Sequence, residues 1–131
     1  MNKTNILICD DHQLVVDGLK NTIALKEHLH FSASAGNGEQ AIKICDTIKI
    51  DLVLMDIDMP VMNGLEATIR LKKKYPQIKI LVLSMHDEPA LIKKIIDIGA
   101  DGYLLKNSDQ EELLIAVDEI VSGKKYFSKE V

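Results

Sequence analysis

Apolar residues in the chain fall into five short runs, and each run precedes a stretch in which apolar residues recur every three or four positions. The runs are Asn5–Cys9, Phe31–Ala35, Leu52–Met55, Lys79–Leu83 and Asp101–Leu105. Unbroken apolar runs are typical of strands buried on both faces of a parallel sheet, and the longer period is typical of helices packed by one side. The pattern predicts strands and helices in strict alternation.

Polar residues and glycines mark where the predicted helices begin and end. Three pairs have capping-box spacing: Asn37 with Gln40, Asn63 with Glu66, and Ser108 with Glu111. Asp87, with Pro89 in the first turn, opens the fourth helix, and Gly99 and Gly123 are placed to end the last two. Right-handed crossovers then put helices on both sides of the sheet. We expect an α/β fold of the doubly wound, flavodoxin-like kind, with a five-stranded parallel sheet and five helices.

Composition narrows the class of protein. At 131 residues, with 47% hydrophobic and 27% charged residues, the chain predicts one globular domain. No apolar run approaches the roughly 20 residues that cross a bilayer, and the N-terminal run is too short for a signal peptide, so we expect a cytoplasmic protein without a membrane contact. A net charge of -4 argues against direct binding of nucleic acid. Cys9 and Cys45 lie within apolar patterns and are interpreted as buried thiols.

Chemically active side chains follow four of the five predicted strands. Asp10 and Asp11 follow the first, Asp56 the third, Ser84 the fourth and Lys106 the fifth. A lone aspartate after an apolar run is most simply a turn former. The carboxyl ends of parallel strands, however, meet at one edge of the sheet, where ligands bind. We therefore expect these five residues to share one crevice.

That combination of residue types favours phosphoryl chemistry. Clustered carboxylates repel one another unless a cation joins them, and carboxylates with a carbonyl and waters suit Mg²⁺. A hydroxyl from Ser84 and the point charge of Lys106 suit phosphate oxygens. Asp56 is then the expected nucleophile, which would form an acyl phosphate.

Nearly the whole chain resembles the response-regulator receiver domains of two-component signalling. The resemblance rests on Asp10-Asp11, the segment DIDMPVMNG that contains Asp56, Ser84, and GADGYLLK ending on Lys106. It implies that Asp56 accepts a phosphoryl group from a sensor histidine kinase, and that the chain is a switch rather than a turnover enzyme.

The resemblance also implies a metal site. Asp10 and Asp11, with Asp56 and the backbone carbonyl of Asp58, would hold Mg²⁺, and Asp11 would be the more direct ligand of the acidic pair. Lys106 would contact the phosphate.

Further roles follow from the same resemblance. Ser84 would move to bond the phosphate, in a position where the family often has Thr. Tyr103 matches the family's aromatic switch position, and the alternative is a tyrosine packed on a strand with its hydroxyl in water. By their position, and not by the resemblance, His12 and His86 lie near the crevice mouth and are candidates for tuning access or dephosphorylation. His86, two residues past Ser84, is the better candidate.

The segment LSMHDEP and the end of the chain resemble the NarL/LuxR-type subfamily, whose receivers precede a helix-turn-helix domain. We expect a receiver domain over residues 1–123 and the start of a linker over residues 124–131, leading to a DNA-binding domain that these 131 residues do not contain. Homodimerisation on phosphorylation and a transcriptional output through that domain are the expected consequences.

Two other functions stay open. The Asp56-x-Asp58 pattern allows a Mg²⁺-dependent phosphohydrolase of the haloacid-dehalogenase kind, although its position on the third strand and the lack of a downstream acid pair weigh against it. A receiver-like interaction module that is never phosphorylated is the other alternative, and the full set of acids, hydroxyl and lysine weighs against it.

Several polar residues are interpreted as solvated. His28 and His30 stand at the end of a predicted helix without metal-ligand spacing. The run Lys72–Lys74 lies near a helix C-terminus, where cations interact favourably with the helix dipole. Gly36 and Gly38 lack the third glycine of a dinucleotide fingerprint, so a nucleotide cofactor is not expected.

Overall fold

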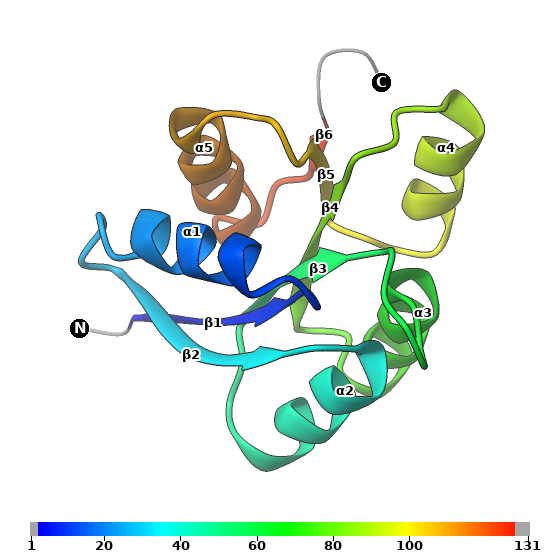
Figure 1. Cartoon of the computed structure of the whole chain (residues 1–131), viewed down its shortest axis with the longest axis horizontal. Coiled ribbons are helices and arrows are strands. Elements are labelled where there is room, and N and C mark those ends of the chain that lie inside the picture. Colours follow the sequence, from blue (N-terminus) through cyan, green and yellow to red (C-terminus); the bar gives the residue numbers. More distant parts are fainter. Residues whose placement is uncertain (1–2, 128–131) are drawn as a thin grey trace.

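The structure, a computed structural model, describes residues 3–127. Strands and helices alternate along the chain (Figure 1). The strands are β1 (Thr4–Cys9), β2 (Leu29–Ala35), β3 (Leu52–Asp56), β4 (Lys79–Ser84), β5 (Gly102–Leu105) and β6 (Tyr126–Phe127). The helices are α1 (Gln13–Ile23), α2 (Gly38–Thr47), α3 (Gly64–Lys74), α4 (Pro89–Asp97) and α5 (Gln110–Val121).

The strands form one sheet in the order β2-β1-β3-β4-β5-β6, and all neighbouring pairs are parallel. The predicted doubly wound architecture is confirmed. The chain leaves β1 toward one edge and returns to continue on its other side, so the order reverses between β1 and β3. In sheets of this kind the crevice at that reversal is where ligands bind.

A sixth strand was not expected. Tyr126 and Phe127 pair with Gly102 and Tyr103 of β5, so the sheet continues past the boundary predicted after residue 123. A strand of two residues has no alternating pattern that could distinguish it from a loop. Residues 128–131, the rest of the predicted linker, lie outside the described residues.

Two apolar layers cover the sheet. Helices α2, α3 and α4 pack on one face through residues such as Ala41, Leu71 and Ile95, and α1 and α5 pack on the other (Figure 1). The strand residues between the layers are almost wholly buried, including every residue of β3. Both cysteine thiols are buried, as predicted, and burial raises the pKa of Cys9 to about 12 and that of Cys45 to about 11.

Helix starts agree with the sequence in two cases and differ in two. The side chains of Asn37 and Asn63 cap α2 and α3 as predicted. The cap of α5 is Asp109, whose carboxylate accepts from Glu112 N–H at 2.8 Å, and the predicted cap Ser108 is wrong by one residue. Two adjacent residues could cap here, and the turn before the helix selects the second. Similarly, α4 begins after Glu88 rather than Asp87.

Other differences concern residues that had been placed in the wrong surroundings. His28 and His30 are exposed as expected, but β2 begins at Leu29, so they flank a strand residue and not a helix end.

No helix in the described part of the chain combines the length and apolar character needed to span a membrane.

Lys72 is not part of a solvated face. Its side chain is 18% exposed, and its ammonium donates to the carbonyl oxygen of Ile78 at 3.0 Å and to the Asp101 carboxylate at 3.0 Å. Helix α3 turns Lys72 toward the residues that directly precede β4 and β5, whereas Lys73 and Lys74 remain exposed.

Candidate functional site

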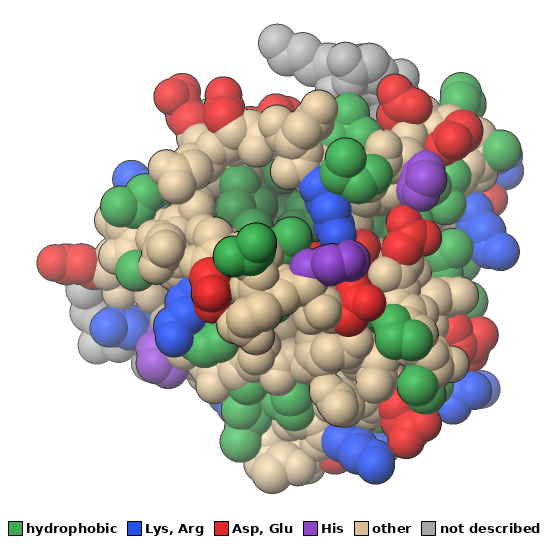
Figure 2. Space-filling model, viewed as in Figure 1, with side chains coloured by type: hydrophobic (Ala, Val, Ile, Leu, Met, Phe, Trp, Pro, Cys, Tyr) green, Lys and Arg blue, Asp and Glu red, His purple; other side chains and the backbone are tan. Residues whose placement is uncertain are grey.

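The carboxyl ends of β1 and β3 bring two buried carboxylates together. Cys9 and Met55 are partners in the pairing of β1 with β3, and Asp10 and Asp56 are the residues that follow them. Their side chains are buried, with 4% of Asp10 and 2% of Asp56 exposed. Acidic side chains gather near the centre of the face in Figure 2, beside a histidine and a basic side chain.

Ser84 and Lys106 enter the same crevice from β4 and β5. Asp56 pairs with Leu83, so Ser84 stands one residue further along β4. The Lys106 N–H donates to the carbonyl oxygen of Ser84 at 2.8 Å, which carries the pairing of β4 with β5 one step past the end of β5. The structure thus brings together residues that are far apart in the sequence.

The Lys106 ammonium lies between the two buried carboxylates. Its Nζ is 2.9 Å from Asp10 Oδ2 and 3.0 Å from Asp56 Oδ1, and its side chain is 13% exposed. Burial alone would lower the pKa of Lys106, but the bonds to Asp10 and Asp56 outweigh burial and raise it. The site therefore keeps a permanent positive charge beside Asp56.

Opposing effects act on the pKa of Asp56. Burial raises its pKa, the bond from Lys106 lowers it, and the nearby charge of Asp10 raises it again. The N–H of Asp58 donates to Asp56 Oδ1 at 3.3 Å and adds a smaller lowering effect. The net direction is upward, so the ionised side chain costs the folded state free energy at neutral pH.

Replacing Asp56 by Asn is therefore expected to stabilise the fold at neutral pH. The folded pKa of Asp56 lies above its unfolded value, so the stability of the unmodified chain falls as the pH rises from the ordinary aspartate range through the folded pKa. An amide does not titrate. The gain in unfolding midpoint should be largest at neutral pH and vanish in acid, measured by thermal unfolding between about pH 4 and 8.

The matched control is Asp17→Asn on the exposed surface of α1, where an amide can still accept the bond from Gln13. It should leave the midpoint unchanged at every pH. A gain for Asp56→Asn that persists equally in acid would contradict the assigned cause.

One oxygen of Asp56 offers a position for a cation. Asp56 Oδ2 is buried and no described residue donates a hydrogen bond to it. Asp10, Asp11, His12 and Asp56 each present one ligand atom, and these atoms lie within 4.8 Å of one another. Asp11 is the more accessible acid, with 31% of its side chain exposed. The donor set fits a divalent ion, because an unbonded buried carboxylate oxygen is costly without a cation.

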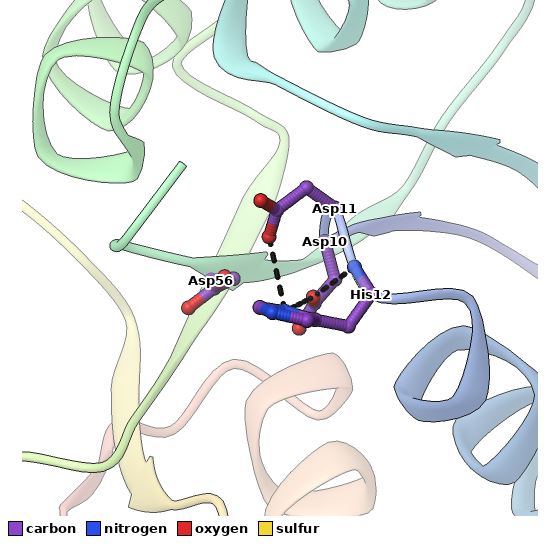
Figure 3. Close-up of side chains that lie close together, drawn as sticks. All are labelled: Asp10, Asp11, His12 and Asp56. Atoms are coloured by element: carbon purple, nitrogen blue, oxygen red, sulfur yellow. Dashed lines mark hydrogen bonds and ion pairs between the residues drawn. The ribbon is translucent and has the colours of Figure 1, made fainter. Parts of the chain in front are cut away.

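His12 belongs to this cluster. The sequence predicted only that His12 lies near the crevice mouth. Its Nδ1 lies 3.2 Å from Asp10 Oδ1 and 3.1 Å from Asp11 Oδ1. The ring reaches from the loop after β1 toward Asp56 (Figure 3). The only signal in the sequence is its position directly after Asp11.

Ser84 and Tyr103 both form hydrogen bonds with the backbone of His86. Ser84 is fully buried, and its Oγ accepts from His86 N–H at 2.9 Å. Tyr103 is fully buried, and its hydroxyl donates to the carbonyl oxygen of His86 at 2.5 Å. A tyrosine with its hydroxyl in water, the alternative for Tyr103, does not describe this arrangement.

The imidazole of His86 takes no part in these two hydrogen bonds and lies at the mouth of the site. Its Nε2 is 3.2 Å from Asp58 Oδ2, and both side chains are at least half exposed. Asp58 therefore points its carboxylate into solvent and turns only its backbone toward Asp56.

Close backbone packing determines where Asp56 sits. A Cβ on Gly64, the first residue of α3, would lie 2.0 Å from the carbonyl oxygen of Asp56 and 2.8 Å from the Cα of Ile57. Only glycine allows the helix to begin this close to the end of β3. In the loop between them, Val61 has φ 67°, a left-handed conformation that is costly for a β-branched residue.

Comparison with known proteins identifies the family. Residues 6–118 match the family described as response regulator receiver domain. The chain belongs to that family. Two curated relatives are the transcriptional regulatory protein DegU of Brevibacillus brevis, 40% identical over 130 residues, and the response regulator UvrY of Escherichia coli (strain K12), 35% identical over 127 residues. These matches cover 99% and 97% of this receiver domain, but only 55% and 58% of the relatives.

Solved structures agree. A two-component response regulator of the LuxR family from Aurantimonas sp. SI85-9A1 superposes with a TM-score of 0.93 at 29% identity, covering 98% of this chain and 92% of that one. The receiver domain of the NarL regulator from Mycobacterium tuberculosis gives a TM-score of 0.88 at 29% identity, covering 95% and 100%. The predicted NarL/LuxR-type likeness is confirmed. A receiver is a signalling domain and not a turnover enzyme, and the phosphohydrolase alternative finds no support.

Proposed function

We propose that this receiver domain is a switch operated by phosphorylation of Asp56. One observation carries the proposal: a buried carboxylate has one oxygen on the Lys106 ammonium and its other oxygen without a hydrogen bond from any described residue. The Lys106 contact fixes the orientation of the carboxylate, so its two oxygens can be divided between a cation and the attack on phosphorus. The donor would be the phosphohistidine of a sensor kinase.

The reaction joins an oxygen of Asp56 to phosphorus and breaks the bond from phosphorus to the imidazole nitrogen of the donor. The bonding pair leaves with that nitrogen. A ring that carries a proton on its other nitrogen departs as neutral imidazole, and a ring without that proton departs as imidazolate and takes a proton from solvent. Lys106, 3.0 Å from Asp56, offsets the negative charge of the transferred group. The chain catalyses only its own phosphorylation and dephosphorylation in this scheme.

The proposed cofactor is Mg²⁺. Asp11, Asp56 and Asp10 would hold it through carboxylate oxygens, with the backbone carbonyl of Asp58 as a further ligand. When bound, Mg²⁺ neutralises charge on the carboxylates and on the phosphoryl oxygens.

The proposed switch runs through Ser84, His86 and Tyr103. A phosphoryl group on Asp56 offers new acceptors to the Ser84 hydroxyl, and a shift of Ser84 toward it would release His86 N–H. The carbonyl of the same residue holds Tyr103, so both bonds report on one backbone position. Exposed His86, paired with Asp58, is proposed to tune how readily water reaches the phosphate.

The partners are proposed from the relatives. One curated relative is named a transcriptional regulatory protein and the other a response regulator, and this chain spans little more than half of their length. We propose that the receiver extends through β6 to Phe127, past the boundary predicted at residue 123, and that the linker to a DNA-binding domain follows it. Homodimerisation on phosphorylation and a cytoplasmic location, where such a regulator reaches DNA, complete the proposal.

Phosphorylation of the protein by acetyl phosphate tests the central step. With Mg²⁺, intact mass should show one added phosphoryl group on the unmodified chain, none on Asp56→Asn, and none when a chelator removes the metal. An unmodified chain that gains no mass would overturn the proposal and favour an interaction module that is never phosphorylated.

Asp58→Asn is the matched control, because the side chain of Asp58 is 62% exposed and only its backbone faces the site. It should still be labelled. Steady turnover of a generic phosphomonoester, lost in Asp58→Asn, would instead support a phosphohydrolase.

A further inference from the structure

An imidazole nitrogen lies among the carboxylates of the proposed metal site. His12 Nδ1 is about equally close to Asp10 Oδ1, at 3.2 Å, and to Asp11 Oδ1, at 3.1 Å. Its ring reaches toward Asp56 from the loop after β1 (Figure 3). The ligand atoms of all four residues lie within 4.8 Å of one another. The site therefore offers one nitrogen and several oxygens.

A second observation points to a cation at this place. Asp56 is 2% exposed, and its Oδ2 accepts no hydrogen bond from the described residues. Lys106 neutralises only part of the charge, since three carboxylates and one ammonium leave two negative charges. A divalent ion would balance these two charges.

The donor types decide which divalent ion is favoured. Mg²⁺ takes oxygen ligands and gains little from an imidazole. Zn²⁺ binds His nitrogen and carboxylate oxygen together and stands far above the hard ions in affinity for mixed nitrogen and oxygen sites.

We propose that His12 is a nitrogen ligand that lets this site bind Zn²⁺ in competition with Mg²⁺. The inference rests on the proposed metal site and deepens it. His12 is 66% exposed, so its ring is free to turn on the surface without disturbing the core. Zinc held by His12, Asp11 and Asp56 would occupy the carboxylates that Mg²⁺ needs, and would lower phosphorylation of Asp56.

Calorimetric titration of the full chain with Zn²⁺ alone and with Mg²⁺ alone tests this assignment. His12→Gln should weaken Zn²⁺ binding by about ten-fold or more, and should change Mg²⁺ affinity by less than about two-fold. His28→Gln is the matched control, because His28 is also exposed and beside a carboxylate, Asp118, but precedes β2 at the opposite end of the strands. It should leave both affinities unchanged.

Co²⁺ provides a spectroscopic readout that does not depend on activity. Its visible absorption should change between the unmodified chain and His12→Gln, because a nitrogen ligand is lost. Equal Zn²⁺ affinities in the two proteins would overturn the proposal, and so would an equal loss of Zn²⁺ and Mg²⁺ binding, which would mean that His12 only positions the acids.

Labelling with acetyl phosphate and Mg²⁺ separates this inference from the proposed function. If Asp56 is labelled but Zn²⁺ affinity does not depend on His12, the zinc inference fails and the proposed function stands. If Zn²⁺ affinity depends on His12 but Asp56 is never labelled, the proposed function fails and the zinc ligand stands.

Discussion

Gly64→Ala is expected to destabilise the fold by about 3 kcal/mol or more and to abolish phosphorylation of Asp56, because the added methyl group has no room. Its Cβ would lie 2.0 Å from the carbonyl oxygen of Asp56 and 2.8 Å from the carbonyl carbon. Both neighbours are backbone atoms at the end of a strand whose every residue is buried, so no side chain can rotate away. Either α3 moves outward or the end of β3 moves inward.

Both movements displace Asp56 relative to Lys106, whose Nζ is 3.0 Å from the carboxylate. A misplacement of this size is enough to cost a reaction that depends on alignment. Chemical denaturation and intact mass after acetyl phosphate measure the two effects.

Gly18→Ala provides the control. Gly18 lies within α1, and a Cβ there would meet nothing within 4 Å. Alanine is the better helix former, so this variant should be more stable by about 0.5–1 kcal/mol and should be labelled normally. Equal stability changes for Gly64→Ala and Gly18→Ala would show that the crowding at Gly64 is not real.

Asp101→Asn is expected to cost about 3–5 kcal/mol of folding stability, the range seen when one partner of a buried ion pair is removed. Asp101 is 2% exposed, and its carboxylate accepts from Lys125 and from Ile80 N–H at 2.9 Å, and from Lys72 at 3.0 Å. An amide of the same size must turn an NH₂ group toward one of these donors. Lys72, mostly buried, would then lack its carboxylate.

The effect should depend on pH in a defined direction. Burial raises the pKa of Asp101, but the bonds from Lys125, Ile80 and Lys72 outweigh it and lower the pKa below its ordinary value. The stabilisation is therefore present above the ordinary aspartate range and is lost as the pH falls through the folded pKa. Urea unfolding at neutral and acid pH should show the two proteins converging in acid.

Asp97→Asn is the matched control. Asp97 also pairs with a lysine, Lys93, at 3.0 Å, but both side chains are more than half exposed. Exposed pairs of this spacing contribute only about 0.3–0.5 kcal/mol. A loss for Asp101→Asn no larger than this would mean that the buried network does not hold β5 and the approach to β6 together.

Much of the site could be predicted, because the residues that follow buried parallel strands can be identified from the hydrophobic pattern of the sequence. Four of the five apolar runs are followed directly by a candidate functional residue, and parallel pairing brings the ends of these runs to one edge of the sheet. The convergence of Asp10, Asp56 and Lys106 follows from that topology, and so does the position of Ser84. Their roles in the reaction remain proposals.

The elements that were predicted wrongly have a common physical origin. In each case two local conformations are close in free energy. Ser108 and Asp109 can both cap a helix, and the turn after Leu105 selects Asp109. Tyr126 and Phe127 are indistinguishable from a loop until the free edge of β5 is available to pair with them. Such selections depend on neighbours that a local pattern does not contain.

The sequence by itself determined the alternation of strands and helices, the doubly wound class and the residues that end each strand, because these depend on hydrophobic period and on local turn chemistry. Only the tertiary structure decided how the charged groups pair: Lys106 with both buried carboxylates, His12 with the acids beside it, and Asp101 with Lys72 and Lys125. Long flexible side chains can reach in many directions, and the packed sheet and helices leave them only those in which a buried charge finds a partner.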